Sequence, residues 1–132
     1  MGTPPKPTPA VVPKLAFPCL IINGDERLRN QWKTLLTTLN YPSLFPLTYI
    51  EAWYELVKQK AGLVIVGNIQ DQLEFRQFLF MVRNDVEFIK TPIIVDSRAL
   101  NEIQKQFTAF LDIHAVIERT HSENDIKNCI SQ

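Results

Sequence analysis

The sequence predicts an α/β domain in which five parallel strands form one sheet covered by helices on both faces. Residues 61–68 carry four consecutive apolar residues, Leu63–Val66, between two glycine-containing breaks. A run this short without polar alternation is typical of a strand buried on both faces. Similar runs alternate along the chain with segments of helical apolar spacing, and each crossover exceeds the dozen residues that a parallel connection needs. The alternation therefore favours a parallel sheet over separate hairpins.

The first half of the chain begins with a predicted strand over residues 17–23 and a predicted helix over residues 25–39. Asp25 at the start of that helix suits its positive N-terminal end. A short second strand is predicted over residues 44–47. Because Pro46 in this strand cannot donate to a hydrogen-bond ladder, the strand should lie on an edge of the sheet.

The next helix is predicted over residues 49–60 and a third over residues 71–83. We expect the core-facing stripe of the earlier one to consist of Ile50, Trp53, Tyr54 and Val57. In the third helix we expect Phe75, Phe78, Leu79 and Val82 to face the sheet. Further apolar residues on other sides of that helix (Leu73, Phe80 and Met81) indicate either deep burial or a surface for a partner or small ligand.

The remaining elements continue the same alternation. We predict a strand at residues 91–95, a helix at 100–110, a strand at 115–118 and a final short helix at 122–130. Ser122 and Asp125 resemble a capping box at the start of that last helix.

Composition sets broad limits on function. Fourteen basic residues balance fourteen acidic ones, which argues against a nucleic-acid partner. No apolar run is long enough to span a membrane, and the N-terminus lacks the apolar core of a signal peptide. Cys19 and Cys129 fit no metal or redox spacing, so we expect reduced thiols in a cytoplasmic protein.

Five of the nine prolines lie within residues 1–14. Such a composition cannot bury a core and predicts an extended tether. We therefore expect a linker over residues 1–15 and one domain over residues 16–132. The tether indicates either a domain taken from the C-terminal side of a longer protein or a vector-derived remnant before a free-standing one.

Four stretches resemble the receiver domains of response regulators: residues 20–29 (LIINGDERLR), 62–67 (GLVIVG), 87–95 (EFIKTPIIV) and 115–119 (AVIER). The resemblance as a whole covers nearly all of residues 17–131. The resemblance implies a flavodoxin-like (CheY-like) sheet of strand order 2-1-3-4-5 with helices on both faces. That order puts the second strand on an edge, in agreement with Pro46.

The chemistry of receivers does not carry over. Receivers hold magnesium with two acids after the first strand, where this chain has Asn23 and Gly24, with Asp25 one residue later. Their phosphate acceptor is an aspartate after the third strand, where this chain has Gly67. An acyl phosphate needs a carboxylate oxygen, and magnesium favours carboxylate ligands. The nearest acid beyond Gly67 is Asp71, and Asp25 alone is more typical of a helix start.

Two further receiver positions are only partly kept. Ser97 matches the hydroxyl residue after the fourth strand, whereas Arg119 replaces the lysine after the fifth, and Thr120 stands where receivers have a cis-proline. The resemblance therefore implies a pseudo-receiver: the receiver architecture without phosphorylation, with no catalytic set, metal or cofactor of its own.

Such a domain is expected to regulate by contact, as a protein–protein interaction module of a two-component signalling protein. It is similar to the C-terminal pseudo-receiver of a cyanobacterial circadian input histidine kinase, which implies a clock protein or its own kinase domain as partner. Two alternatives stay open. One is a sensor of a small molecule such as a quinone, using the aromatic residues of the third and fourth helices, and the other is a phosphorylatable receiver with an atypical acceptor.

The edge strand is the predicted partner-binding element. Its residues are Leu44, Phe45, Pro46 and Leu47. Its outer side should carry unpaired backbone groups to which a partner strand could add, with Phe45 or Leu44 supplying selectivity. Alternatively, Pro46 is there to prevent such pairing, although it removes only one donor.

Histidine chemistry has little support in the sequence. His114 and His121 flank the predicted fifth strand, without further residues at metal-ligand spacing. Ser97, His121 and Asp96 are the residue types of a catalytic triad, but the sequence contains no nucleophile elbow to support one.

Overall fold

A computed structural model describes residues 17–71, 73–108, 113–119 and 121–131 of the chain. Within these residues five strands form one parallel sheet in the order β2-β1-β3-β4-β5, so the predicted fold class and strand order are confirmed. The strands are β1 (Cys19–Ile22), β2 (Ser43–Leu44), β3 (Leu63–Val66), β4 (Ile93–Asp96) and β5 (Ala115–Ile117). The helices are α1 (Glu26–Thr38), α2 (Tyr49–Gln59), α3 (Phe75–Asn84), the 3-10 turn η1 (Ser97–Ala99), α4 (Glu102–Thr108) and α5 (Glu123–Ser131).

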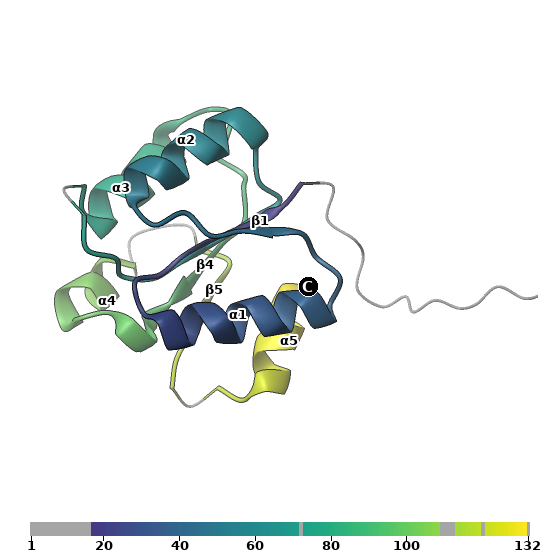
Figure 1. Cartoon of the computed structure of the whole chain (residues 1–132). Helices are drawn as coiled ribbons and strands as arrows, with labels where there is room; N and C mark the ends of the chain where they lie inside the picture. The colour runs from purple at the N-terminus through teal and green to yellow at the C-terminus, as the bar shows by residue number, and fades with distance from the viewer. Residues whose placement is uncertain (1–16, 72, 109–112, 120, 132) are drawn as a thin grey trace, which may run out of the picture.

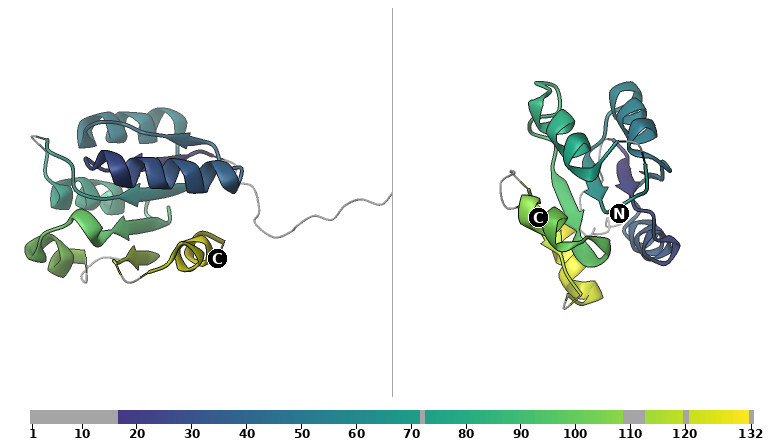
Figure 2. Two further views of the ribbon diagram at one scale, coloured as in Figure 1. Left: turned by 60° about the horizontal axis from the view of Figure 1, so that its bottom comes forward. Right: turned by 90° about the vertical axis from the view of Figure 1, so that its left-hand side faces the viewer.

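The helices form two layers on opposite faces of the sheet. Figure 1 shows α2 and α3 on one side of the strands and α1 and α5 on the other, and Figure 2 shows the same layers from two further directions. Alternate strand residues divide between the layers, because successive side chains of a strand point to opposite faces. Leu20 and Ile22 pack in the α2–α3 core, whereas Cys19 and Ile21 pack in the α1–α5 core.

The second strand is shorter than predicted and begins one residue earlier. Only Ser43 and Leu44 pair with β1, opposite Cys19 and Leu20. Phe45, Pro46 and Leu47 leave the ladder and lead to the N-cap of α2, so their assignment to a strand was wrong. Pro46 has no N–H to continue the ladder, which explains why pairing stops before it. The edge position is correct.

The predicted core stripe of α2 was also wrong. The side chains that this helix buries are Tyr49, Ala52 and Leu56. The predicted residues Ile50, Tyr54 and Val57 are 55%, 64% and 50% exposed, and only Trp53 is partly buried, edge-on to Phe88. The helix is apolar on two sides, so spacing alone could not choose the buried one.

The third helix buries the predicted residues. Phe75, Phe78, Leu79 and Val82 are in the core, and Phe80 is 54% exposed. The helix begins at Phe75 because a capping box between Glu74 and Gln77 starts it there.

Some predictions lie outside the described residues: the tether over residues 1–15, the end of the fourth helix at Phe110, and Thr120. In the part of the chain that is described, no helix is both long and apolar enough to cross a membrane.

Candidate functional site at the carboxyl edge of the sheet

The loop after β1 is folded on itself. Asn23 is 1% exposed, and its Oδ1 accepts the backbone N–H of Asp25 at 2.9 Å. Asp25 in turn caps α1, because its Oδ1 accepts the N–H groups of Arg27 at 2.9 Å and Leu28 at 3.2 Å. The prediction that Asp25 is a helix-start residue is therefore confirmed. Among the buried side-chain atoms of the described residues, Asn23 Nδ2 has no hydrogen-bond partner.

Gly67 follows β3 and lies directly against that amide. A Cβ at position 67 would stand 2.5 Å from Asn23 Nδ2 and 3.0 Å from Asn23 Cγ, closer than packed atoms approach. The Asn23 side chain thus occupies the space into which any side chain at position 67 would project. The main chain of Gly67 is also fixed, since its N–H donates to Ile22 O at 2.6 Å.

Gly67 and the segment that follows it are tied to α2. The Tyr49 hydroxyl donates to Gly67 O at 2.7 Å, and burial raises the pKa of this hydroxyl, so it stays protonated as a donor. Asp71 Oδ2 accepts the N–H groups of Tyr49 at 2.8 Å and Ile50 at 3.4 Å. The nearest acid to Gly67 in the sequence therefore serves the first turn of a helix.

Ser97 and Arg119 have contacts of their own. The Ser97 hydroxyl is buried and donates to Ile117 O in β5 at 2.8 Å. Arg119 is exposed, and its Nη2 donates to Arg98 O at 3.2 Å. Of the six candidate positions, the structure brings Asn23, Gly24, Asp25 and Gly67 together at the ends of β1 and β3, where the Gly24 N–H donates to Asn68 O at 2.7 Å. Ser97 and Arg119 belong to the β4–β5 side.

A buried ion pair at the end of β4 was missed by the sequence analysis. Asp96 is fully buried, and its Oδ2 accepts Trp32 Nε1 and Arg98 Nη2, both at 2.7 Å. Its Oδ1 accepts the Nε of Arg98 at 2.8 Å and the backbone N–H of Arg98 at 3.2 Å. An aspartate ending an apolar strand, with arginine two residues later, was the available signal.

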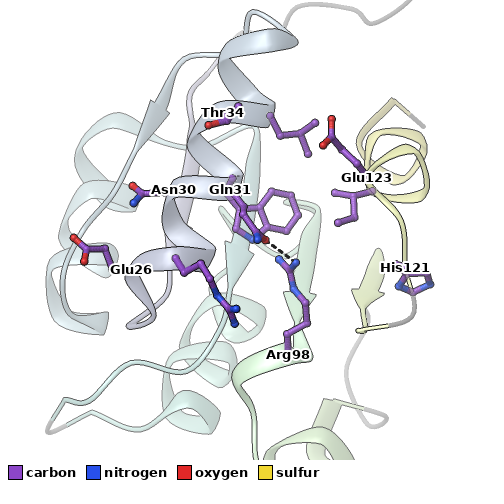
Figure 3. A pocket seen from close by; sticks show the side chains of 11 residues that line it. Glu26, Asn30, Gln31, Thr34, Arg98, His121 and Glu123 are labelled. Atoms are coloured by element: carbon purple, nitrogen blue, oxygen red, sulfur yellow. Dashed lines mark hydrogen bonds between the residues drawn. The ribbon is translucent and has the colours of Figure 1, made fainter.

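The ion pair borders a cleft between α1 and α5 of about 760 Å³. In Figure 3 the Arg98 guanidinium reaches Gln31 of α1, to which Nη1 donates at 3.0 Å, while His121 and Glu123 lie on the opposite wall. His121 Nδ1 accepts the Glu118 N–H at 2.9 Å. Ser97, Asp96 and His121 each form hydrogen bonds with other groups, so the geometry gives no support to a catalytic triad.

A metal centre would need several ligands that converge on one point. No group of three or more His, Cys, Asp or Glu side chains suited to a metal ion occurs among the residues that the structure describes. The two acids nearest the ends of the central strands, Asp25 and Asp96, already accept two and four hydrogen bonds.

The predicted edge residues line a groove with α2. Leu44 and Phe45 are half-buried, Pro46 is buried and Leu47 is 61% exposed. Together with Ile50, Glu51, Tyr54 and Glu55, the first three border a cavity of about 460 Å³. A second, more apolar groove of about 610 Å³ lies between α3 and α4, with Phe80 and Phe107 on its walls.

Comparison with solved structures places this arrangement among receiver domains. A receiver domain of a signal transduction histidine kinase from Syntrophus aciditrophicus superposes with a TM-score of 0.73 at 13% identity, covering 88% of this chain and 91% of that one. This chain has the receiver fold. The receiver domain of a Pseudomonas aeruginosa sensor histidine kinase, which carries magnesium in its active-site cleft, superposes with a TM-score of 0.75 at 10% identity, over 86% of this chain and 93% of that one.

The receiver fold is shared equally by a domain of an HD domain-containing protein from Pseudomonas fluorescens. Its TM-score is 0.74 at 15% identity, with 90% of this chain and 91% of that one covered. No family model and no curated protein matches the chain. At such identities the likeness concerns the fold alone.

Proposed function

We propose that this domain is a pseudo-receiver: a regulatory, protein-binding module of a two-component signalling protein that works without being phosphorylated. The observation that carries the proposal is the contact between Asn23 and Gly67. The receiver fold places its phosphate acceptor after β3, and here that position has no side chain and the space beside it is filled by an amide. An amide is neither a phosphate acceptor nor a charged magnesium ligand.

The acids near this edge are occupied in ways that support the same proposal. Asp25 caps α1, and Asp71 accepts the N–H groups of Tyr49 and Ile50 in the first turn of α2, so each carboxylate stabilises a helix start. An atypical acceptor would require one of them to give up these hydrogen bonds, which typically costs about 1 kcal/mol.

The test is phosphorylation by a small-molecule donor. The chain is incubated with acetyl phosphate and Mg²⁺ and examined by intact mass, beside a receiver domain that has an acceptor aspartate. We expect the control to gain a phosphoryl group and this chain to gain none. Stoichiometric modification, mapped to Asp25 or Asp71, would instead favour the atypical-acceptor alternative.

The proposed partner is a signalling protein, either the chain's own histidine kinase or, as the sequence resemblance implies, a clock protein. The edge of the sheet supports this, since among the described residues β2 pairs only with β1, and it borders the groove of Phe45 and Ile50. Phe45→Arg should weaken a partner that adds at this edge, while Ile103→Arg, which changes a 67% exposed residue of α4, should not. Binding kept in Phe45→Arg would place the interface elsewhere.

A small-molecule sensor is the second candidate, and the groove between α3 and α4 favours it. Phe80 and Phe107 line the groove with ring centroids 6.3 Å apart. Phe78, another aromatic residue of the third helix, is fully buried against Tyr49 and does not line this groove. Titration with a water-soluble quinone should then shift the NMR signals of Phe80 and Phe107, and an unchanged spectrum at saturation would dismiss this function.

A further inference from the structure

The outer face of α2 carries more apolar surface than the fold uses. Tyr49, Ala52 and Leu56 already bury one side of this helix in the core. On the other side Ile50, Tyr54 and Val57 are each at least half exposed, and Leu47 just before the helix is 61% exposed. Single exposed apolar residues are common, but three on one side of one helix together with Leu47 just before it form a patch of the kind that proteins cover with a partner.

The three residues within α2 follow a helix-packing pattern. Ile50, Tyr54 and Val57, spaced by four and three residues, form one row along the helix, and with Leu47, which precedes the N-cap Thr48, we call this set the α2 seam. This is the spacing with which two helices pack side by side, about 8–10 Å apart. No helix of the described part of the domain covers the seam, because α2 lies at the outer end of its layer beside α3 (Figure 1).

The charges beside the seam indicate which partner fits. Glu51 and Lys58 are seven residues apart, so they flank the same edge of the seam, one near each end of α2. The Lys58 ammonium lies 5.8 Å from the centre of the Tyr54 ring and therefore stays beside the seam. Lys60, the next cation, is engaged with Glu87 in the connection between α3 and β4.

This charge pattern is complementary to itself. When two copies of α2 pack antiparallel about a two-fold axis between Tyr54 and Val57, Tyr54 of each copy meets Val57 of the other. Glu51 of each copy then faces Lys58 of the other, and the symmetry produces this opposite-charge contact twice. We propose that the α2 seam is a homodimerisation surface, on which a second copy of this chain packs its own α2 antiparallel. This inference does not rest on the proposed signalling function.

A charge-reversal cycle tests the proposal on the full chain. Sedimentation velocity from about 5 to about 500 μM measures the dissociation constant of the wild type and of the variants. Glu51→Lys and Lys58→Glu each replace two opposite-charge contacts by two like-charge contacts, so each variant alone should dimerise at least about tenfold more weakly. The double variant should recover the wild-type constant.

Mixing the two single variants is the decisive measurement. In Glu51→Lys both positions 51 and 58 are positive, and in Lys58→Glu both are negative, so the cross-contacts are attractive only between unlike chains. We expect an equimolar mixture to form heterodimers with a dissociation constant near that of the wild type, although each variant alone dimerises much more weakly. This recovery by mixing requires that positions 51 and 58 face each other across the interface.

Control variants distinguish changes at the seam from changes of charge elsewhere on the surface and from loss of folding. Glu55→Lys reverses a charge one residue outside the seam and should change the dissociation constant by less than about threefold. Tyr54→Lys should abolish the dimer, whereas Val86→Lys, at a 90% exposed residue beyond the end of α3, should not. Circular dichroism verifies that each variant is folded, because Glu51 also accepts the Leu47 N–H at 2.9 Å.

Three outcomes would overturn the proposal: a wild-type chain that stays monomeric over the whole range, a dimer that survives Tyr54→Lys, or single variants that fail to associate on mixing. A monomeric wild type would indicate that the seam binds a different protein and not a second copy of this chain. None of these results would bear on phosphorylation, so a failure here leaves the proposed function to its own test.

Discussion

Asn23 and Asp96 both stand at the carboxyl ends of central strands, and both are buried, but their surroundings differ. The carboxylate of Asp96 is fully hydrogen-bonded by Trp32 and Arg98, which come from two different elements. Asn23 keeps its Nδ2 donors without a partner and rests against Gly67. The β4 end is thus built as a stable ion pair, whereas the β1–β3 end fills space at some energetic cost.

The two buried polar side chains at this edge therefore differ in their effect on stability: Asp96 is paired, and Asn23 has an unpaired donor. An unpaired buried donor costs about 1–3 kcal/mol, so folding alone would not select Asn23. A charged carboxylate buried there without a partner would cost considerably more than the unpaired amide. The amide is a compromise that fills the position without introducing a charge.

Breaking the ion pair should weaken the fold most. Asp96→Ala leaves the Arg98 guanidinium, whose side chain is only 15% exposed, without its carboxylate, and leaves Trp32 Nε1 without an acceptor. The free energy of unfolding should fall by about 3–5 kcal/mol, as measured by urea denaturation. Glu118→Ala, at an exposed acid just after β5, is the control. A loss below about 1 kcal/mol in Asp96→Ala would mean that the ion pair contributes little.

A smaller loss is expected where Asn23 meets Gly67. Gly67→Ala introduces a methyl group 2.5 Å from Asn23 Nδ2, and we expect it to destabilise the domain by about 1–3 kcal/mol in urea denaturation. In an Asn23→Gly background the same change should cost clearly less, because the amide is gone. Strictly additive losses in the two backgrounds would show that the two positions do not compete for space.

Removing the amide itself should change stability little. Asn23→Ala loses the hydrogen bond from the Asp25 N–H but also removes the unpaired Nδ2. The two effects oppose each other, so the unfolding free energy should stay within about 1 kcal/mol of the wild type. A loss of unfolding free energy as large as that of Asp96→Ala would mean that Asn23 stabilises the fold as much as the buried ion pair does.

The smallest effect on stability at neutral pH is expected from the ionisation of the Cys19 thiol, at the opposite end of β1. Burial raises the pKa of its thiol from 9.0 to about 12. Above pH 9 the unfolded chain releases this proton while the folded chain keeps it, so stability should fall as pH rises from 9 towards 12. Cys19→Ala should make this decline shallower in urea melts at several pH values. An identical slope would mean that Cys19 does not titrate in this window.

Much of the fold was predictable from apolar spacing. The strand order, the edge position of β2 and the cap formed by Asp25 all follow from local patterns or from the resemblance to receivers. The buried side of α2 was not predictable, because Ile50, Tyr54 and Val57 make as regular a stripe as Tyr49, Ala52 and Leu56. Only the packing of the whole sheet decides between two such stripes.

The candidate site was predictable in part. The absence of a carboxylate at Gly67 can be read from the sequence, but the direction of the Asn23 side chain cannot. The hydrogen bond from Trp32 to Asp96 joins residues 64 positions apart, a separation that no local pattern reports. Ser97 matched the receiver pattern by type, and its hydrogen bond to Ile117 became visible only when β4 and β5 were placed side by side.

The bond between the Tyr49 hydroxyl and the Gly67 carbonyl has a practical consequence for protein engineering. Because Tyr49 in the first turn of α2 donates to the peptide carbonyl of residue 67, a side chain introduced at position 67 that displaces this carbonyl would disturb that turn as well. Variants at position 67 should therefore be examined for changes in the packing of α2 on a second copy, in addition to changes in stability.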